Sequence, residues 1–247
     1  MTSIAPARWR VERHESLTST NDRAIAAAEA GEPPGLVVLA REQTQGRGRS
    51  GRVWHSPRGN LFCSILLPPD DALRGGAAAL LSGLAAHDAI AGLVPPPHRL
   101  ALKWPNDLLV GAAKLGGILT EGGTTQAGRS WLVAGIGLNL AHHPDGLDRP
   151  VTSLPALGAT AADPGMVADR LAAAFAARLA LLAGGGMAAI IAAWSARAIA
   201  PGTALAVNAA SGRLAGRFAG IDHDGALLLA TDAGTRRVVA GEVFAEV

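Results

Sequence analysis

The sequence predicts an α+β protein, in which a main domain of sheet and helices is followed by a small all-β unit. Up to about residue 200, short apolar runs typical of strands are interspersed with alanine-rich helical segments. Beyond Pro201, alternating segments separated by Asp-Gly and Ala-Gly turns indicate a small meander of barrel type. An apolar fraction of 49% and a charged fraction of 17% favour a sizeable core and exclude intrinsic disorder. We therefore expect a main domain at 1–200 and a C-terminal domain at 201–247.

The main domain begins with a predicted helix at 24–30, because the side chains of Ser19 to Asp22 suit a helix N-terminus and Gly31 suits its end. A second helix at 77–93 ends before three consecutive prolines. Pro105, Asn106 and Asp107 favour a tight turn, so the strands on either side of them form a hairpin. Apolar runs predict strands at 36–40, 61–67, 100–104, 108–110, 114–121 and 130–140.

Two alanine-rich helices are expected at 167–183 and 187–198, separated by Gly184 to Gly186. The uncharged stretch 179–196 is interrupted by these glycines, whereas a membrane span needs roughly 20 strongly apolar residues. No signal-peptide core is recognised in the first residues, and the single cysteine, Cys63, excludes an intrachain disulfide. We therefore expect a soluble cytoplasmic protein. The C-terminal strands are predicted at 205–207, 213–221, 226–230 and 236–240.

Residues 45–60, QGRGRSGRVWHSPRGN, concentrate four arginines and four glycines between two predicted strands. Arginine presents a fixed fork of donors that suits carboxylate and phosphate, and glycine lets a backbone approach and close over an anion. Neither a Walker loop nor a dinucleotide fingerprint is present. The formal net charge of only +2 makes any anion affinity local, and an aromatic content of 4% disfavours a nucleic-acid interface.

Three further positions carry alternatives that the residues alone leave open. Lys114 precedes Gly116 and Gly117 in a predicted strand, where glycines allow the close approach of a ligand, so it is either an anion anchor or a surface lysine. Asn106 and Asp107 could orient Lys114 or hold a metal ion, although their spacing favours plain turn residues. Asn139 lies in an apolar strand, and its amide bonds either the structure or a ligand edge.

Taken in order, five segments closely resemble the motifs of biotin protein ligases. They are STN at 19–21, GRGRSGRVW at 46–54, KWPNDL at 103–108, KLGGIL at 114–119 and GIGLNL at 135–140. The stretch from Gly225 to Val243 resembles the small SH3-like domain of that family. The resemblance implies a class II synthetase-like catalytic domain with a central mixed sheet and helices, plus a C-terminal SH3-like β-barrel. Only about fifteen residues precede Ser16, so it also implies the form without an N-terminal DNA-binding domain.

The resemblance implies a two-step reaction. Biotin and ATP, with Mg²⁺, give biotinyl-5′-AMP and pyrophosphate, and the biotinyl group then passes to a lysine of a carrier domain. That partner is expected to be the biotin carboxyl carrier domain of an acetyl-CoA, acyl-CoA or pyruvate carboxylase, with no DNA or membrane partner. Lys114, Arg49 and Asp107 are implied as catalytic, Lys114 lying between the biotin carboxylate and the α-phosphate. No metal ligands are assigned.

The same resemblance implies the binding residues. For biotin they are Ser19, Thr20, Gln43, Arg47, Lys114, Gly116 and Gly117. For the nucleotide they are Arg47, Arg49, Arg52, Trp54, Asn106 and Asn139. The stretch 149–154 lacks the aromatic residue that stacks on adenine in some relatives, and Cys63 is interpreted as a core residue. The competing hypotheses are a lipoate-protein ligase or octanoyltransferase, and an RNA-binding module.

Overall fold

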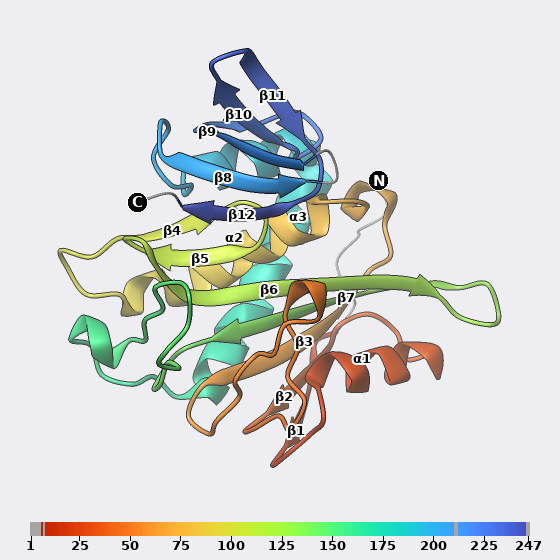
Figure 1. Cartoon of the computed structure of the whole chain (residues 1–247). Helices are drawn as coiled ribbons and strands as arrows, with labels where there is room; N and C mark the ends of the chain where they lie inside the picture. The colour runs from red at the N-terminus through yellow and green to blue at the C-terminus, as the bar shows by residue number, and fades with distance from the viewer. Residues whose placement is uncertain (1–5, 7, 210–211, 246–247) are drawn as a thin grey trace.

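The computed structural model describes residue 6 and residues 8–209 and 212–245, which form two β-sheets with three long helices (Figure 1). The larger sheet has the strand order β1-β2-β3-β7-β6-β5-β4. Strand β1 runs parallel to β2 and every other pairing in this sheet is antiparallel, so the expected mixed sheet is confirmed. Its strands are β1 (Arg10–His14), β2 (Leu36–Ala40), β3 (Leu61–Leu67), β4 (Leu100–Lys103), β5 (Asp107–Val110), β6 (Ala113–Thr124) and β7 (Ser130–Leu138).

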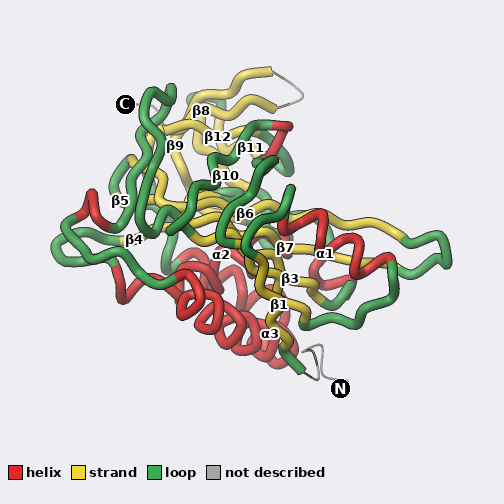
Figure 2. The backbone as a smooth tube through the Cα atoms, turned by 90° about the horizontal axis from the view of Figure 1, so that it is seen from below, coloured by secondary structure: helices red, strands yellow, loops and turns green. Residues whose placement is uncertain are grey.

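The helices α1 (Thr20–Glu29), α2 (Ala77–Ile90) and α3 (Pro164–Ser195) cover the two faces of the larger sheet. Alternate residues of a strand point to opposite faces. Accordingly, Val37 and Leu39 pack in the core cluster of α2 and α3, whereas Leu36 and Val38 pack with α1. Figure 2 shows α2 and α3 together on one side of the strands. Short 3-10 turns occur at η1 (Arg49–Gly51), η2 (Asp71–Leu73), η3 (Ala91–Leu93) and η4 (Pro155–Leu157).

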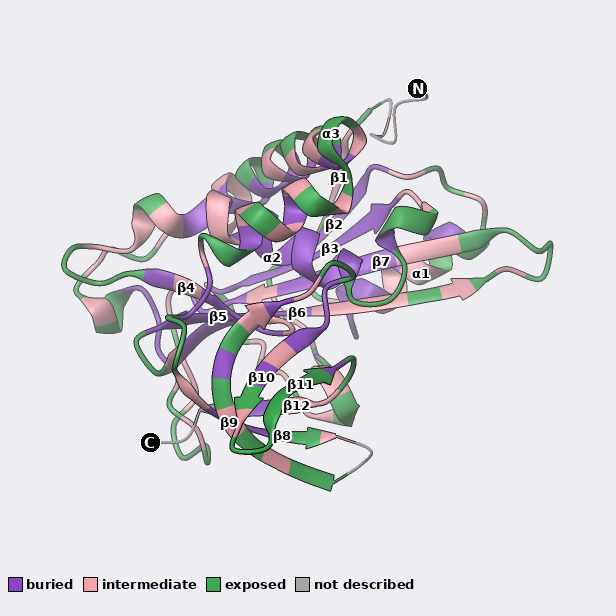
Figure 3. Cartoon of the chain, turned by 90° about the horizontal axis from the view of Figure 1, so that it is seen from above, coloured by how far each residue is buried: buried purple, intermediate pink, exposed green. Residues whose placement is uncertain are grey.

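Helix α3 contains the break that the sequence predicts between two helices at Gly184 to Gly186. It runs for 32 residues, and only Gly186, with φ 64°, departs from helical geometry, so the predicted break is local. Among the described residues it is the one helix long and apolar enough to span a membrane by length and composition. Its residues Phe175, Leu179 and Trp194 are buried in the larger core, against α2 and the sheet. Figure 3 shows exposed and half-buried residues along the side of this helix that is in view, with buried residues among them.

The smaller sheet has the order β11-β10-β9-β8-β12 and is antiparallel throughout. The predicted meander is confirmed, but the last strand, β12, was missed by the sequence prediction. Pairing among the described strands leaves β11 and β12 as edges and does not close a barrel. The strands are β8 (Ala204–Ala209), β9 (Gly212–Ile221), β10 (Leu227–Thr231), β11 (Gly234–Val238) and β12 (Glu242–Ala245).

The smaller sheet docks on the β4–β5 hairpin of the larger one. The indole N–H of Trp104 donates to the carbonyl of Gly225 (2.9 Å), and the ammonium of Lys103 donates to the carbonyl of Val243 (2.7 Å). Because Lys103 and Trp104 belong to the KWPNDL motif, the motif both turns the hairpin and holds β12 beside it. The division into domains at residue 200 remains a prediction.

Candidate active site

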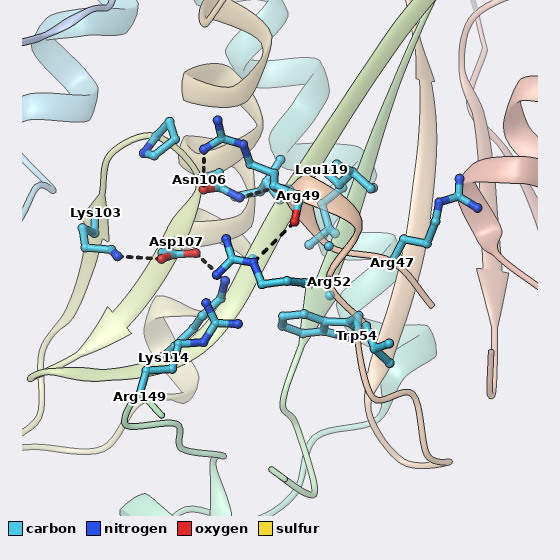
Figure 4. Close-up of a pocket in the computed structure, with 18 of the residues that line it drawn as sticks. Arg47, Arg49, Arg52, Trp54, Lys103, Asn106, Asp107, Lys114, Leu119 and Arg149 are labelled. Carbon is cyan, nitrogen blue, oxygen red and sulfur yellow. Dashed lines mark hydrogen bonds and ion pairs between the residues drawn. The ribbon is translucent and has the colours of Figure 1, made fainter. Parts of the chain in front are cut away.

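A cavity of about 240 Å³ lies where the larger sheet, the arginine-glycine loop and strand β12 meet (Figure 4). Most of the residues singled out from the sequence line it, although they come from segments far apart in the chain. Those that line it are Ser19, Thr20, Gln43, Arg47, Arg49, Arg52, Trp54, Asn106, Asp107, Lys114 and Gly117.

Glycines on β6 and β7 form part of the cavity wall. A Cβ atom at Gly117 would lie 2.9 Å from Nζ of Lys114, and a Cβ atom at Gly137 would lie 2.5 Å from the ring of Trp54. Real Cβ atoms do not approach other atoms this closely, so any side chain at these positions would displace Lys114 or Trp54. Gly117 was expected to permit the close approach of a ligand. In this structure the groups that lie close to it are the side chains of Lys114 and Trp54.

Asp107 is the central carboxylate of the cavity and not a plain turn residue, which corrects the interpretation that its spacing favoured. The turn consists of residues 104–106, and Asp107 is the first residue of β5, with 8% of its surface exposed. Its Oδ2 lies 2.8 Å from Nζ of Lys103, and its Oδ1 pairs with Nζ of Lys114. Burial alone would raise the pKa of Asp107, but the charges of Lys114 and Lys103 outweigh burial and lower it to about 2.

Lys114 is buried as well, which excludes the surface-lysine alternative. Burial lowers the pKa of its ammonium, Asp107 opposes that shift, and the positive charges of Arg149 and Lys103 add to it. One carboxylate therefore pairs with two ammonium groups, so the cluster keeps an excess of positive charge. Nζ of Lys114 also lies 5.4 Å from the ring centroid of Trp54. An anionic ligand would complete the charge balance of this wall.

The arginine-glycine loop sends its guanidinium groups in two directions. Nη1 of Arg49 lies 3.4 Å from Oδ1 of Asn106 and 3.4 Å from the carbonyl oxygen of Gly241, and burial lowers the pKa of its guanidinium. Arg52 pairs with Glu242 of β12. These contacts tie the loop to both sheets.

Arg47 does not join that cation cluster. Its guanidinium donates to Oδ2 (2.8 Å) and Oδ1 (2.6 Å) of Asp22, and lies 3.7 Å from Oε1 of Glu121. These bonds raise the pKa of Arg47. Figure 4 shows the side chain of Arg47 turned away from Lys114 and Arg52. The physical reason is that α1 and β6 present two carboxylates at this end of the loop. Arg47 thus anchors the loop at one end of the cavity.

Polar groups at the start of α1 line the end of the cavity near Arg47. The backbone N–H of Thr20 donates to Oε1 of Gln43 (2.8 Å), and Nε2 of Gln43 donates to Oγ of Ser56 (3.0 Å). Ser19 occupies the N-cap position of α1, as predicted, but its side chain makes no capping hydrogen bond. Hydroxyl and amide groups that line a cavity in this way can bind a polar ring.

Two of the expected site residues lie outside the cavity lining. A Cβ atom at Gly116 would lie 2.4 Å from Cδ2 of Leu138, so this glycine admits a core side chain of β7 and not a ligand. The amide of Asn139 donates to the carbonyl of Thr152 (2.9 Å) and is buried. The two alternatives for the amide of Asn139 were a bond to the protein and a bond to a ligand. In this structure the amide bonds to the protein.

Sequence reasoning missed several residues of the lining. Gly135 and Gly137 alternate within GIGLNL, and alternation on one strand places both on one face, so this signal was available. Lys103 opens the KWPNDL motif but was given no role, although its place in that motif was a signal. Arg149 and the β12 residues Val243 and Phe244 reach the cavity only through tertiary structure.

The metal-binding alternative for Asp107 does not fit its contacts, because each of its carboxylate oxygens already pairs with a lysine. Within residues 6, 8–209 and 212–245, no group of three or more His, Cys, Asp or Glu side chains is placed to hold an ion. Cys63, in contrast, behaves as expected. It is fully buried in the core, and burial raises the pKa of its thiol to about 12.

Comparison with known proteins gives two family matches. Residues 14–139 match the model of the Biotin/lipoate A/B protein ligase family, and residues 206–245 match the Biotin protein ligase C terminal domain. The biotin–[acetyl-CoA-carboxylase] ligase of Paracoccus denitrificans is 40% identical over 92% of this chain and 96% of its own length. The corresponding ligase of Mycobacterium tuberculosis is 36% identical over 91% of this chain and 85% of its own length.

Solved structures agree in fold. The biotin protein ligase of Aquifex aeolicus in complex with biotin and ATP superposes with a TM-score of 0.82 at 23% identity, covering 96% of this chain and 99% of that one. The Leishmania major ligase in complex with biotinyl-5-AMP gives a TM-score of 0.65 at 23% identity, covering 96% of this chain and all of that one. With both of its sheets matched by family models, and with a relative aligned along nearly its whole length, this chain belongs to the biotin protein ligase family.

Proposed function

We propose that this chain is an ATP-dependent ligase that activates biotin as biotinyl-5′-AMP and transfers the biotinyl group to a lysine of a carrier protein. The observation that carries this function is the convergence of Lys114, Arg49 and Arg52 on one cavity wall, in a chain of this family. Relatives named as biotin–[acetyl-CoA-carboxylase] ligases, and related structures with biotin and ATP or with biotinyl-5-AMP, support the same substrates.

Biotin has an apolar body, a polar ureido ring and a carboxylate tail. The hydroxyl and amide groups of Ser19, Thr20 and Gln43 suit the ureido ring, and the ring of Trp54, which packs against Gly137, suits the apolar body. The carboxylate would then reach toward Lys114. With the ureido ring near α1 and the carboxylate near Lys114, each end of biotin meets the groups that suit it. Donors and acceptors lie at one end of the cavity, and cations lie at the other.

In the first step a carboxylate oxygen of biotin attacks the α-phosphorus of ATP, and the bond to the pyrophosphate oxygen breaks. Two anionic reactants repel each other, so positive charge fixed at the reacting atoms lowers the barrier. Lys114 supplies that charge, and Asp107 holds its ammonium in place. Any Mg²⁺ would be held largely by the phosphate oxygens, because the carboxylate of Asp107 is already paired.

In the second step the amine of the acceptor lysine attacks the carbonyl carbon of the mixed anhydride, and AMP leaves. Until then the anhydride must be kept from water, and a closed arginine-glycine loop does this. Arg52 and Glu242 join the loop to β12, and Arg47 and Asp22 join it to α1. The acceptor is proposed to be the biotin carboxyl carrier domain of a carboxylase. The free, buried thiol of Cys63 suits the reducing cytoplasm as the site of this reaction.

A lipoate-protein ligase is the second candidate, because the family model for residues 14–139 covers both acyl chemistries. The two functions differ in the end of the substrate that is recognised. Lipoate has no ureido group to engage Thr20 and Gln43, and the match at 206–245 is to a biotin ligase domain. Biotin is therefore favoured.

Purified protein incubated with labelled ATP and either biotin or lipoate, with no carrier present, tests this function. We expect biotinyl-5′-AMP with biotin and no acyl-adenylate with lipoate. Adenylate formed only with lipoate would replace the proposal with the second candidate. Binding of single-stranded RNA at physiological salt, with no adenylate from either acid, would favour the RNA-binding module.

A further inference from the structure

The cations of the cavity differ in whether another residue already neutralises them. Asp107 pairs with Lys103 and Lys114, and Glu242 pairs with Arg52. Among the residues that line the cavity, the cations are Arg47, Arg49, Arg52, Lys103, Lys114 and Arg149, and the carboxylates are Asp107, Asp148 and Glu242. The cavity wall therefore carries more positive than negative charge.

Arg149 is the cavity cation that lacks a partner. Arg47 and Arg49 have hydrogen bonds to Asp22 and Asn106, but the guanidinium of Arg149 makes no hydrogen bond or ion pair with any residue that the structure describes. Its neighbour Asp148 is exposed and forms no ion pair with it at the described positions. Arg149 is instead close enough to Lys114 for the two charges to repel. An unpaired arginine held beside another cation favours a ligand with more than one negative charge.

The backbone fixes Arg149 beside Lys114. The N–H of Lys114 donates to the carbonyl of Pro150 (3.0 Å), and the N–H of Thr152 donates to the carbonyl of Lys114 (2.9 Å). These bonds form a short parallel bridge between Lys114 and Val151, outside the regular sheet. The loop that carries Arg149 is thus locked to the strand that carries Lys114. Backbone pairing therefore holds Arg149 and Lys114 near each other, whichever rotamers their side chains adopt.

Arg149 lies at the end of the cavity away from the polar pocket at α1. In Figure 4 its guanidinium points toward Lys114 and Arg52, whereas Arg47 lies on the opposite side of the site. With biotin's ureido ring near α1 and its carboxylate at Lys114, the next group along is the triphosphate. A guanidinium fork binds two phosphate oxygens at once, which a lysine cannot do.

We propose that Arg149 is a substrate-binding residue that holds the β- and γ-phosphates of ATP, and hence the pyrophosphate as it leaves. This inference rests on the proposed function, because it places a nucleotide in the cavity. Arg149 makes its contact with the part of ATP that departs after the first step. Its loss therefore affects adenylate formation and its reversal, but not the transfer of biotin to the carrier.

Steady-state kinetics in both directions test this role. In the reverse direction, the enzyme is given biotinyl-5′-AMP and inorganic pyrophosphate, and ATP formation is measured. For Arg149→Gln we expect the KM for pyrophosphate and the KM for ATP to rise about 10-fold or more, the effect of one charged hydrogen-bonding group. The Kd of biotin and the rate of transfer from preformed biotinyl-5′-AMP should stay within about 2-fold of the wild type. Arg149→Lys should recover part of the loss.

The matched control is Arg74→Gln, because Arg74 is a surface arginine outside the cavity, and among the described residues its side chain pairs with the exposed Asp71 alone. It should leave every constant unchanged. An unchanged KM for pyrophosphate in Arg149→Gln overturns the inference, and an equal rise in the Kd of biotin would place Arg149 on the biotin carboxylate. A wild-type protein that forms no adenylate would contradict the proposed function instead, so the two failures are distinguishable.

Discussion

Asp107 and Lys114 form an ion pair between β5 and β6 in the cavity wall, and each side chain is only 11% exposed. The register of these two strands shifts between Leu108 and Leu109, just beyond Asp107. Leu109 pairs with Lys114, and Asp107 pairs with Gly117. Because Gly117 has no side chain, the ammonium of Lys114 can lie across it and reach Asp107.

Replacing Lys114 with alanine should remove adenylate formation while leaving the fold intact. The charge that offsets the repulsion between the two reactants is lost, and removal of one such group costs about 10²- to 10³-fold in rate. Asp107 keeps Lys103 as a partner, so no buried carboxylate is left alone. Pyrophosphate release measures the rate, and thermal unfolding checks the fold. Near wild-type release of pyrophosphate would contradict the role given to Lys114.

Replacing Asp107 with asparagine should be worse for stability than the lysine change. Lys103 and Lys114 would then share no carboxylate, and breaking a buried ion pair in this way costs about 3 kcal/mol or more. The pKa of Asp107 falls from 3.8 to about 2 on folding, so its contribution is present above pH 3.8 and is lost as the pH falls through about 2. Urea unfolding of Asp107→Asn should therefore show a lower free energy at pH 7. Its free energy should also vary less than that of the wild type between pH 4 and pH 2.

The alkaline limit of the reaction should depend on whether ATP is bound. Burial lowers the pKa of Lys114 in the free protein, and the protonated form is the one that attracts phosphate, so activity is lost as the pH rises through this lowered value. A bound triphosphate favours the charged form and raises the pKa again. The profile of kcat/KM for ATP, which reports the free enzyme, should thus fall at a lower pH than the profile of kcat. Coincident alkaline limbs would argue against Lys114 as the titrating group.

The ion pair between Arg47 and Asp22 should set how long the loop stays closed over the adenylate. Both side chains are more than a third exposed, so the pair stabilises the closed loop by only about 0.2–1 kcal/mol. Asp22→Asn should therefore speed the release of biotinyl-5′-AMP by about 2- to 5-fold without a change in the melting temperature. Asp71→Asn, which removes an exposed partner of Arg74 outside the cavity lining, is the control. Equal release rates for the two variants would show that this pair does not hold the loop.

The fold could be predicted closely where local pattern and burial agree. Strands β3 and β7 and helix α2 are apolar segments bounded by glycine, proline or polar residues, so their approximate positions follow from sequence. Strand β1 was missed because RVERH is an edge strand with several exposed or half-buried charges and no apolar alternation. Strand β12 was missed because it pairs with β8, and no local signal indicates a long-range pairing of this kind.

Lys114 was singled out because a cation precedes two strand glycines, and Arg49 because it lies in a stretch rich in arginine and glycine. The polar residues at α1, and the role of each residue, were implied only by the resemblance to biotin protein ligases. For Asp107, spacing alone favoured a turn residue, because a carboxylate after proline and asparagine has the same local pattern whether it turns the chain or pairs with two buried lysines. For Arg47, the resemblance implied contact with the substrates, and this stays a prediction because Arg47 lines the cavity. Its pairing with Asp22 and Glu121 could not be predicted, since only the folded chain brings these residues together.

Local chemistry in the chain was therefore sufficient for the helices, for most of the strands and for the position of the arginine-glycine loop between two of them. The folded structure alone determined which cations are neutralised and which remain free. Arg149 is available for a ligand because the parallel bridge at Val151 places it beside Lys114, while Glu242 and Asp107 are already used by other cations. Ion pairing depends on distances of a few ångströms, and those distances are set by long-range strand pairing.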